Sequence, residues 1–194
     1  MMTKHEKLNK LNKYWQKNCK CKLKKTATQA VFGSGNANSD IVFIGEAPGK
    51  NEDLKGIPFV GSAGKFLDEM LNGIGKKREN IYITNIVKYR PPNNRDPEPK
   101  EKEDCNLWLI SELKIISPKL IVFLGRHSMM RFSPKEKIGK VHGKLIIIDT
   151  MELGKQAFMP LYHPAAALYN GSMRETLIKD FKKIPKILTK IKNH

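Results

Sequence analysis

The chain has 194 residues, of which 40% are hydrophobic, and it carries a formal net charge of +17. This length supports one sizeable core and is short for two, so we expect a single domain over residues 1–194. Three cysteines, an odd number, argue against a disulfide framework, and no apolar run approaches the ~18 residues of a membrane helix. The chain also starts without the apolar segment of a signal peptide. This composition favours an intracellular protein, cytoplasmic or nucleoid-associated, without a membrane partner.

The positive charge is concentrated at the two ends of the chain. Residues 1–25 hold nine lysines and one glutamate, and residues 179–194 hold six lysines and one aspartate. These two segments carry 13 of the 17 net charges, and we expect a lysine-rich N-terminal helix with a cysteine loop and a lysine-rich C-terminal helix end. Such an excess favours a polyanionic partner, with nucleic acid as the first candidate. Solvated lysine-rich helix faces explain the charge equally well.

The first half of the chain alternates helical and strand patterns. Leu8, Leu11 and Trp15 follow one another at helical spacing and predict a helix over 4–17 that docks by one stripe. Short apolar runs followed by turn residues predict buried strands. The elements that follow are a strand within 40–49, a helix from residue 62 and a strand within 80–92.

The second half continues the alternation. Its predicted elements are a helix from residue 98, a strand at 119–125, a short helix after Gly125, a short strand at 144–150, a strand within 158–164, and a closing helix over 172–192 interrupted at Pro185. Strands that alternate with helices indicate an α/β fold, with a parallel sheet covered on both faces.

Polar side chains follow three of the predicted strands. Glu46 comes after the first, Asn85 lies late in the second, and His163 follows the last. In open parallel sheets, ligands bind outside the carboxyl ends of the strands. The sequence therefore predicts a cleft that holds a carboxylate, an amide and an imidazole.

Two motifs add detail to this cleft. "GEAPGKNEDLKGIPFVGSAG" (45–64) places Glu46 in a turn after a strand and presents Phe59 in a loop, although a lone phenylalanine is more often core filling. "HPAAAL" (163–168) fixes the backbone after His163 with a proline and leaves room beside it with three alanines. A lone histidine is more often structural than catalytic, but its position beside the Glu46 loop favours a functional role.

Together with "TNIVKYRPPNNR" (84–95) and "LIVFLG" (120–125), these motifs resemble the family-4, thermostable-type branch of the uracil-DNA glycosylase superfamily. The resemblance runs from about residue 18 to about residue 182. It implies a three-layer α/β/α sandwich with a central four-stranded parallel sheet. It also implies a monomeric DNA-repair enzyme that flips uracil out of single- or double-stranded DNA and hydrolyses its N-glycosidic bond.

The resemblance implies roles for individual residues. Phe59 would stack on uracil, Asn85 would read its edge, and His163 would contact its O2 atom. Glu46 would support the attack of water. Two further residues belong to the implied uracil pocket, namely Gly45 and Glu52, with Glu52 as the wall at C5 of the base.

Residues outside the pocket would contact DNA. Leu168 is the candidate wedge that fills the gap left by the flipped base, and Tyr169 follows it. Ser62 and the backbone amides of the glycine loops would hold phosphates without reading sequence.

The chain departs from the resemblance at the cysteines that hold a [4Fe-4S] cluster in many family members. Tyr89 stands at the third cysteine position, Cys105 keeps the fourth, Cys21 aligns with the second, and Asn18 falls at the first, with Cys19 one place off. Such clusters bind four thiolates, so we expect no cluster, with Tyr89 filling the vacated volume. A labile [4Fe-4S] cluster and a zinc ion on the three cysteines are the alternatives.

No lysine is placed in a motif as a Schiff-base nucleophile, so we expect a monofunctional glycosylase. Two alternative functions stay open. One is a glycosylase of the same fold with another base specificity, for hypoxanthine or thymine. The other is a DNA-binding relative whose pocket has lost activity.

Overall fold

The structure is a computed structural model that describes residues 1–192, and its centre is a six-stranded sheet. The strand order is β1-β3-β2-β4-β6-β5. The strands are β1 (Ser34–Gly35), β2 (Ile41–Gly45), β3 (Tyr82–Asn85), β4 (Leu120–Leu124), β5 (Ile146–Thr150) and β6 (Gly154–Leu161). The four middle strands are parallel, and β1 and β5 are antiparallel edges.

The expected four-stranded sheet was therefore wrong in strand number, although its parallel centre is present. The β1 strand has only two residues and no apolar alternation, so the sequence gives no strand signal there. The β5 strand pairs with β6 as a hairpin from Thr150 to Gly154, which makes it antiparallel.

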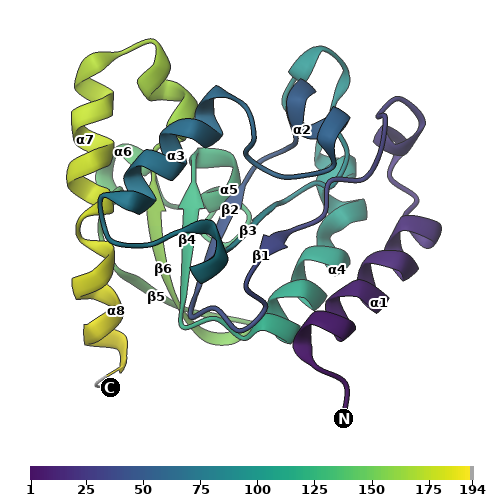
Figure 1. Ribbon diagram of the computed structural model, residues 1–194, viewed down its shortest axis with the longest axis horizontal. Helices are drawn as coiled ribbons and strands as arrows, with labels where there is room; N and C mark the ends of the chain where they lie inside the picture. Colours follow the sequence, from purple (N-terminus) through teal and green to yellow (C-terminus); the bar gives the residue numbers. More distant parts are fainter. Residues whose placement is uncertain (193–194) are drawn as a thin grey trace.

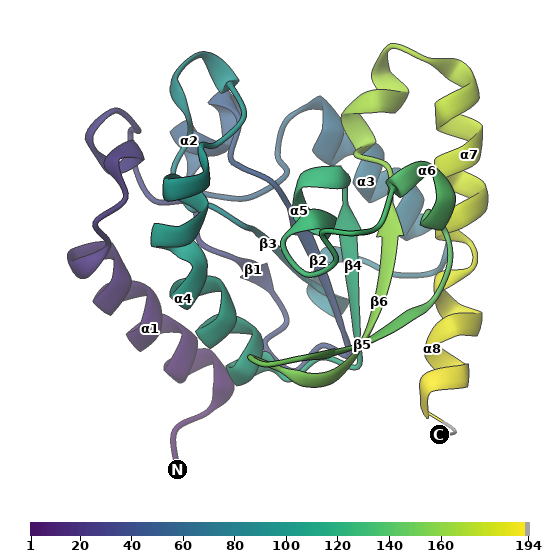
Figure 2. The same cartoon turned by 180° about the vertical axis from the view of Figure 1, so that it is seen from behind.

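Helices cover both faces of the sheet and form the three expected layers (Figures 1 and 2). On one face lie α1 (Lys4–Asn18) and α4 (Pro99–Ile116), and on the other lie α3 (Ser62–Asn72), α7 (Gly171–Phe181) and α8 (Ile184–Lys192). Short elements complete the chain, namely α2 (Lys50–Lys55), α5 (Arg126–Met130), α6 (Ile138–Val141) and the 3₁₀ turns at Lys22–Lys25, Arg78–Asn80, Pro92–Asn94 and Pro164–Leu168. None of the described helices is long and apolar enough to cross a membrane.

Alternation along the strands divides the interior into two cores. On β2, Val42 and Ile44 face the core under α4, and Ile41 and Phe43 face the core under α3 and α7. Successive strand side chains point to opposite faces, so all four are buried only because helices cover both. The sheet is therefore held from both sides, and its carboxyl end is left to the loops.

The apolar side chains predicted to lie along one side of the N-terminal helix pack α1 against α4. Leu8 is buried, and Trp15 stacks on Trp108 with ring centroids 6.4 Å apart. The Trp108 Nε1 atom donates to Asn12 Oδ1 at 3.0 Å. This aromatic contact fixes the N-terminal helix against the same core as the sheet.

The closing helix is broken, but not at Pro185. The break falls at residues 182–183, and Pro185 lies in the first turn of α8, where its missing N–H has no intrahelical partner to lose. The predicted lysine-rich end at 179–194 includes residues 193 and 194, which lie outside the described residues.

Candidate active site

The carboxyl ends of the central strands border a cavity of about 340 Å³. Glu46 follows β2, Asn85 ends β3, and His163 comes shortly after β6. The structure brings these three together with Phe59 and Glu52 as lining residues of the same cavity. Parallel strands that end at one edge of the sheet explain how positions 46 and 163 become neighbours.

Asn85 presents an unpaired acceptor to this cavity. The residue is 2% exposed, and its Oδ1 is buried without a hydrogen-bond partner among the described residues. A Cβ atom at Gly45 would collide with Asn85 Oδ1 and lie 2.6 Å from Phe59 Cζ. An unpaired buried acceptor costs about 1–3 kcal/mol, a cost that a donating ligand removes.

Phe59 is held in a strained backbone conformation. Its φ of 55° lies in the left-handed region, which is unfavourable for a bulky residue. Arg78 braces the loop by donating to the carbonyl oxygens of Pro58, at 3.0 Å, and Phe59, and its Nε lies 2.6 Å from Asp68 Oδ1. The ring is thereby fixed at the cavity wall, with its centroid 5.8 Å from that of His163.

Glu52 ties α2 to the loop that carries Phe59. Its Oε1 accepts from the backbone N–H groups of Val60 at 2.8 Å and Gly61 at 2.7 Å. Gly61 is the N-cap of α3, so the carboxylate also lies at the positive end of that helix. These bonds hold the Glu52 side chain in one place at the cavity wall.

His163 is a neutral donor at neutral pH. Its Nδ1 accepts from the backbone N–H of Ala165 at 3.1 Å, so the neutral ring carries its proton on Nε2. Burial, helped by the nearby charge of His127, lowers the pKa of His163 to about 4. The ring therefore offers an N–H group without a positive charge of its own.

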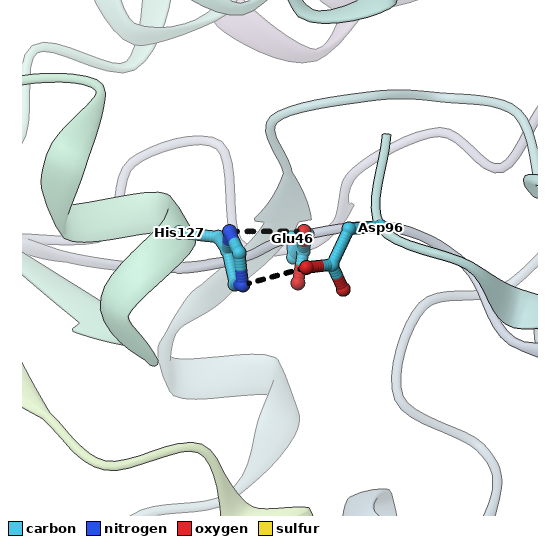
Figure 3. Close-up of side chains that lie close together, drawn as sticks. All are labelled: Glu46, Asp96 and His127. Carbon is cyan, nitrogen blue, oxygen red and sulfur yellow. Dashed lines mark ion pairs between the residues drawn. The ribbon is translucent and has the colours of Figure 1, made fainter. Parts of the chain in front are cut away.

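Glu46 is the least stabilised carboxylate of the cavity. Burial, and secondarily the negative charge of Asp96, raise its pKa to about 7. Its Oε1 is buried without a hydrogen-bond partner among the described residues and lies 3.4 Å from His127 Nδ1. His127 Nε2 lies 3.2 Å from Asp96 Oδ2, so the two ring nitrogens face two carboxylates that lie on the same side of the imidazole (Figure 3). Their ligand atoms all lie within 4.8 Å of one another, a spacing that a divalent cation could bridge.

A buried ionic network fixes the end of β3 behind the cavity. Lys88 and Glu112 are fully buried and pair at 2.7 Å. Lys88 Nζ also donates to the backbone oxygen of Asn85 at 3.1 Å and to Thr84 Oγ1, and Tyr82 donates to Glu112 at 2.8 Å. A fully satisfied network of this kind rigidifies the backbone from which the Asn85 side chain projects.

Comparison with known proteins identifies the family. The family model described as "Uracil DNA glycosylase superfamily" matches residues 32–190. The chain belongs to this superfamily.

Three similar relatives are named type-4 uracil-DNA glycosylase. The protein from Archaeoglobus fulgidus is 48% identical over 180 residues, which cover 88% of each chain. The protein from Sulfurisphaera tokodaii is 50% identical over 171 residues, covering 85% of this chain and 77% of the relative. The protein from Thermotoga maritima is 39% identical over 194 residues, covering 98% and 99%.

The residues expected to contact DNA lie outside the cavity of this superfamily member. Ser62 is exposed in the first turn of α3. Leu168, 41% exposed, ends the 3₁₀ turn that begins just after His163, and Tyr169 beside it is 91% exposed. A large apolar pair is thus presented to solvent close in sequence to the cavity wall.

Cys105, on α4, lies close to both Cys19 and Cys21 in the same core. A hydrogen bond from the Cys105 thiol would stabilise the thiolate of Cys19 or Cys21. It lowers the pKa of Cys19 to about 7 and lowers that of Cys21, while the pKa of Cys105 is raised. All three side chains are buried.

Tyr89 occupies the fourth corner of this cysteine cluster. It is 2% exposed, its ring meets Trp108 edge-on at 6.3 Å, and its hydroxyl is buried without a partner among the described residues. Burial and the neighbouring thiols raise the pKa of Tyr89. Asn18, at the first family position, instead donates to the backbone of Tyr14 at 2.7 Å. The corner therefore offers three sulfur atoms and does not match a cluster that needs four.

Sequence reasoning missed His127, Asp96 and the Lys88–Glu112 pair. A signal for His127 was available, because it follows a predicted strand at residue 125, as the other pocket residues follow theirs. Asp96 belongs to the proline loop, whose path depends on tertiary contacts. The Lys88–Glu112 pair joins residues 24 positions apart, and nothing local marks them as partners.

Proposed function

We propose that this protein removes uracil from DNA by hydrolysing the N-glycosidic bond and leaves an abasic site in an uncut strand. The observation that carries the proposal is the buried, unpaired Asn85 Oδ1 in a cavity walled by Phe59. Relatives named type-4 uracil-DNA glycosylase, matched over most of their length, support the same activity.

Base choice follows from the amide of Asn85. Oδ1 accepts from uracil N3–H and Nδ2 donates to O4, while Phe59 stacks on the ring and Gly45 leaves room for both. Cytosine presents an acceptor at N3 and a donor at N4, so both contacts are mismatched. A site whose buried polar groups are left unpaired by the wrong base discriminates by about 10⁴-fold. Glu52 is the wall that excludes the C5 methyl group of thymine.

The reaction needs charge of both signs. As the C1′–N1 bond breaks, its electron pair stays on uracil, and the neutral His163 ring donates from Nε2 to the developing charge at O2. The Glu46 carboxylate stabilises the positive charge on the sugar and accepts a proton from the water that attacks C1′. Uracil and an abasic sugar are the products.

DNA reaches the cavity after base flipping, which costs a few kcal/mol of unstacking. Leu168 fills the vacated position in the stack, with Tyr169 beside it, and Ser62 holds a phosphate at the start of α3. No lysine lines the cavity among the described residues, in keeping with simple hydrolysis rather than strand cleavage. The protein would act as an intracellular monomer, one domain over residues 1–194, on single- or double-stranded DNA.

This member would act without a [4Fe-4S] cluster. Three converging thiols and a buried phenol do not supply the four thiolates such a cluster binds, and zinc would lack a fourth strong ligand. Anaerobically purified protein is expected to lack absorbance near about 400 nm and stoichiometric iron. A brown sample with about four irons per chain would contradict this.

The function is tested with oligonucleotides that carry a single uracil, thymine, cytosine or hypoxanthine, followed by alkali to cut abasic sites. Cleavage at uracil alone is expected, and it should disappear in Asn85→Ala and His163→Ala. Cleavage at hypoxanthine or thymine would indicate another base specificity. No cleavage of any substrate would indicate a DNA-binding relative.

A further inference from the structure

We propose that Asp53 is a positioning residue that holds α2 in place and thereby fixes Glu52 against C5 of the flipped base. The inference rests on the proposed function, because Glu52 is the group assigned there to the exclusion of thymine. Asp53 follows Glu52 on the same short helix but is not part of the cavity lining. It would therefore set base selectivity from outside the pocket.

The helix α2 has no apolar anchor. Of its six residues only Asp53 is buried, with 4% of its surface exposed. Leu54, the single apolar residue of the helix, is 58% exposed. An isolated helix this short is unstable, and in proteins helices are held mostly by a packed apolar face. The position of α2 therefore depends on polar contacts.

Asp53 supplies most of these contacts. Its Oδ1 accepts from the backbone N–H of Thr28 at 2.9 Å, and its Oδ2 accepts from the Thr28 hydroxyl at 2.7 Å. The backbone nitrogen of Gln29 lies 3.5 Å from Asp53 Oδ1, and Gln29 Nε2 donates to the carbonyl oxygen of Leu54 at 3.0 Å. Hydrogen bonds to a carboxylate are stronger than those between neutral groups. Asp53 is therefore the main link between α2 and residues 28–29.

The segment that receives Asp53 is itself fixed to the core. Ala30 and Val31 are buried, and the backbone N–H of Val31 donates to the carbonyl oxygen of Lys88 at 2.7 Å. Lys88 belongs to the buried ionic network behind the cavity. Through Thr28, Asp53 thus ties a helix without an apolar anchor to the backbone that this network holds.

Glu52 needs this tie because its two ends are held by different parts of the chain. Its Oε1 accepts from the backbone N–H groups of Val60 and Gly61, and a Cβ atom at Gly49 would lie 2.8 Å from its Oε2. These contacts fix the carboxylate end, whereas the backbone end moves with α2. A misplacement of about 1 Å is enough to change how a side chain acts on a bound group. Both ends must therefore be fixed for Glu52 to exclude a methyl group.

Loss of the Asp53 contacts is expected to change selectivity more than uracil release. Uracil carries only hydrogen at C5 and does not press on the Glu52 side chain. A base with a large C5 substituent does, and it gains room when α2 is no longer held. The ratio of the two release rates therefore reports on the position of Glu52.

The experiment measures single-turnover release of uracil, 5-fluorouracil and 5-bromouracil from otherwise identical oligonucleotides by the whole protein and its variants. Bromine is similar in size to a methyl group, and fluorine is closer to hydrogen. Asp53→Ala removes both acceptors, whereas Asp53→Asn keeps an oxygen for the Thr28 N–H and an amide that donates to the Thr28 hydroxyl. Thr28→Val removes one hydrogen bond from the opposite side. Leu8→Ala truncates a buried residue of α1 and is the control for a general loss of stability.

In Asp53→Ala the ratio of uracil to 5-bromouracil release should fall by about tenfold, because 5-bromouracil is released faster. Thr28→Val should lower the ratio in the same direction by less, and it carries the test if Asp53→Ala does not fold. Asp53→Asn and Leu8→Ala should keep the wild-type ratio, and the ratio of uracil to 5-fluorouracil should stay constant throughout. In a Glu52→Ala background, Asp53→Ala should have no further effect, because Asp53 acts through Glu52.

Thermal unfolding shows which variants are folded at the assay temperature. An unchanged ratio in the folded variants of Asp53 and Thr28, an equal fall in Leu8→Ala, or a further fall in the Glu52→Ala background would overturn the inference while the uracil activity stands. A wild-type protein that releases no uracil would refute the proposed function, and the inference with it.

Discussion

Two regions of this molecule contain buried polar atoms without a hydrogen-bond partner among the described residues. In the cavity at the strand ends these are Asn85 Oδ1 and Glu46 Oε1. In the cysteine corner, which consists of Cys19, Cys21, Cys105 and Tyr89, it is the Tyr89 hydroxyl. The cavity atoms lie beside about 340 Å³ of open space, whereas Tyr89 is packed against thiols and Trp108. An unpaired polar atom therefore points to a ligand where there is room for one. In the cysteine corner, the ring that carries the unpaired hydroxyl is itself packed against Trp108 and near the thiols.

The largest expected effect separates stability from activity in the cavity. Asn85→Leu keeps the side-chain shape but removes the unpaired acceptor, so the free energy of unfolding should rise by about 1 kcal/mol. The rate of uracil excision should fall by about 10³-fold or more, because both base-reading hydrogen bonds are lost. Denaturant unfolding and single-turnover kinetics measure the two effects. Asn72→Ala, at an exposed site late in α3, is the matched control and should change neither.

The next largest expected effect is on stability and concerns the buried Lys88–Glu112 ion pair, which supports the backbone of Asn85. Lys88→Met leaves the Glu112 charge buried and unpaired and should lower the free energy of unfolding by about 3–5 kcal/mol. Adding Glu112→Gln removes that charge, keeps an acceptor for Tyr82, and should restore part of the loss. Denaturant unfolding compares both with Lys100→Met, a solvent-exposed lysine whose loss should leave the midpoint unchanged. Equal losses in the single and double variants would show that the buried ion pair is not the source of the stability.

A smaller effect is expected in the cysteine corner. Tyr89→Phe removes a hydroxyl that is buried without a partner, so the free energy of unfolding should rise by about 1 kcal/mol while uracil excision stays unchanged. Denaturant unfolding of protein prepared with and without a chelator makes the measurement. If Tyr89→Phe lowers stability and the chelator removes a bound metal only from wild type, the hydroxyl is a metal ligand and the comparison with the cavity fails.

The smallest effect tests the electrostatics of Glu46. Asp96→Asn removes a negative charge that raises the pKa of Glu46, so the acid limb of the pH–rate profile should move to lower pH. Asp96 is 63% exposed, so the shift should be less than about one pH unit and should shrink at high salt. A shift to higher pH would show that Asp96 supports the ionised form of Glu46 instead of opposing it.

Much of the fold and of the cavity could be predicted from the sequence, because each buried strand is a short apolar run with a recognisable end. The apolar runs around Phe43 and Val122 predict buried parallel strands, and the polar residues after them predict the cleft. The meeting of Glu46 and His163 at one cavity also follows from strand ends that lie at one edge of the sheet. The two-residue edge strand β1 and contacts such as Arg78 with the Phe59 carbonyl could not be predicted, because they depend on tertiary geometry and not on local pattern.

The cysteine corner shows a different limit. The family resemblance implies that Cys105 keeps a ligand position and that Tyr89 replaces one, but it leaves open whether the three thiols still lie close together. In the structure Cys105 lies close to both Cys19 and Cys21, because α1 and α4 pack through Trp15 and Trp108 and bring the N-terminal loop against α4. Whether these thiols bind a metal or a cluster depends on the number and type of ligand atoms around them, which the spacing of residues in the sequence does not give.

The central claim is that the unpaired amide of Asn85 recognises uracil. The most direct test quantifies free uracil released from a uracil-containing oligonucleotide by wild type and by Asn85→Leu, with a cytosine oligonucleotide alongside. We predict one uracil released per strand by wild type, no release of cytosine, and release by the folded variant that is slower by about 10³-fold or more. Equal release of uracil by wild type and Asn85→Leu would contradict the account.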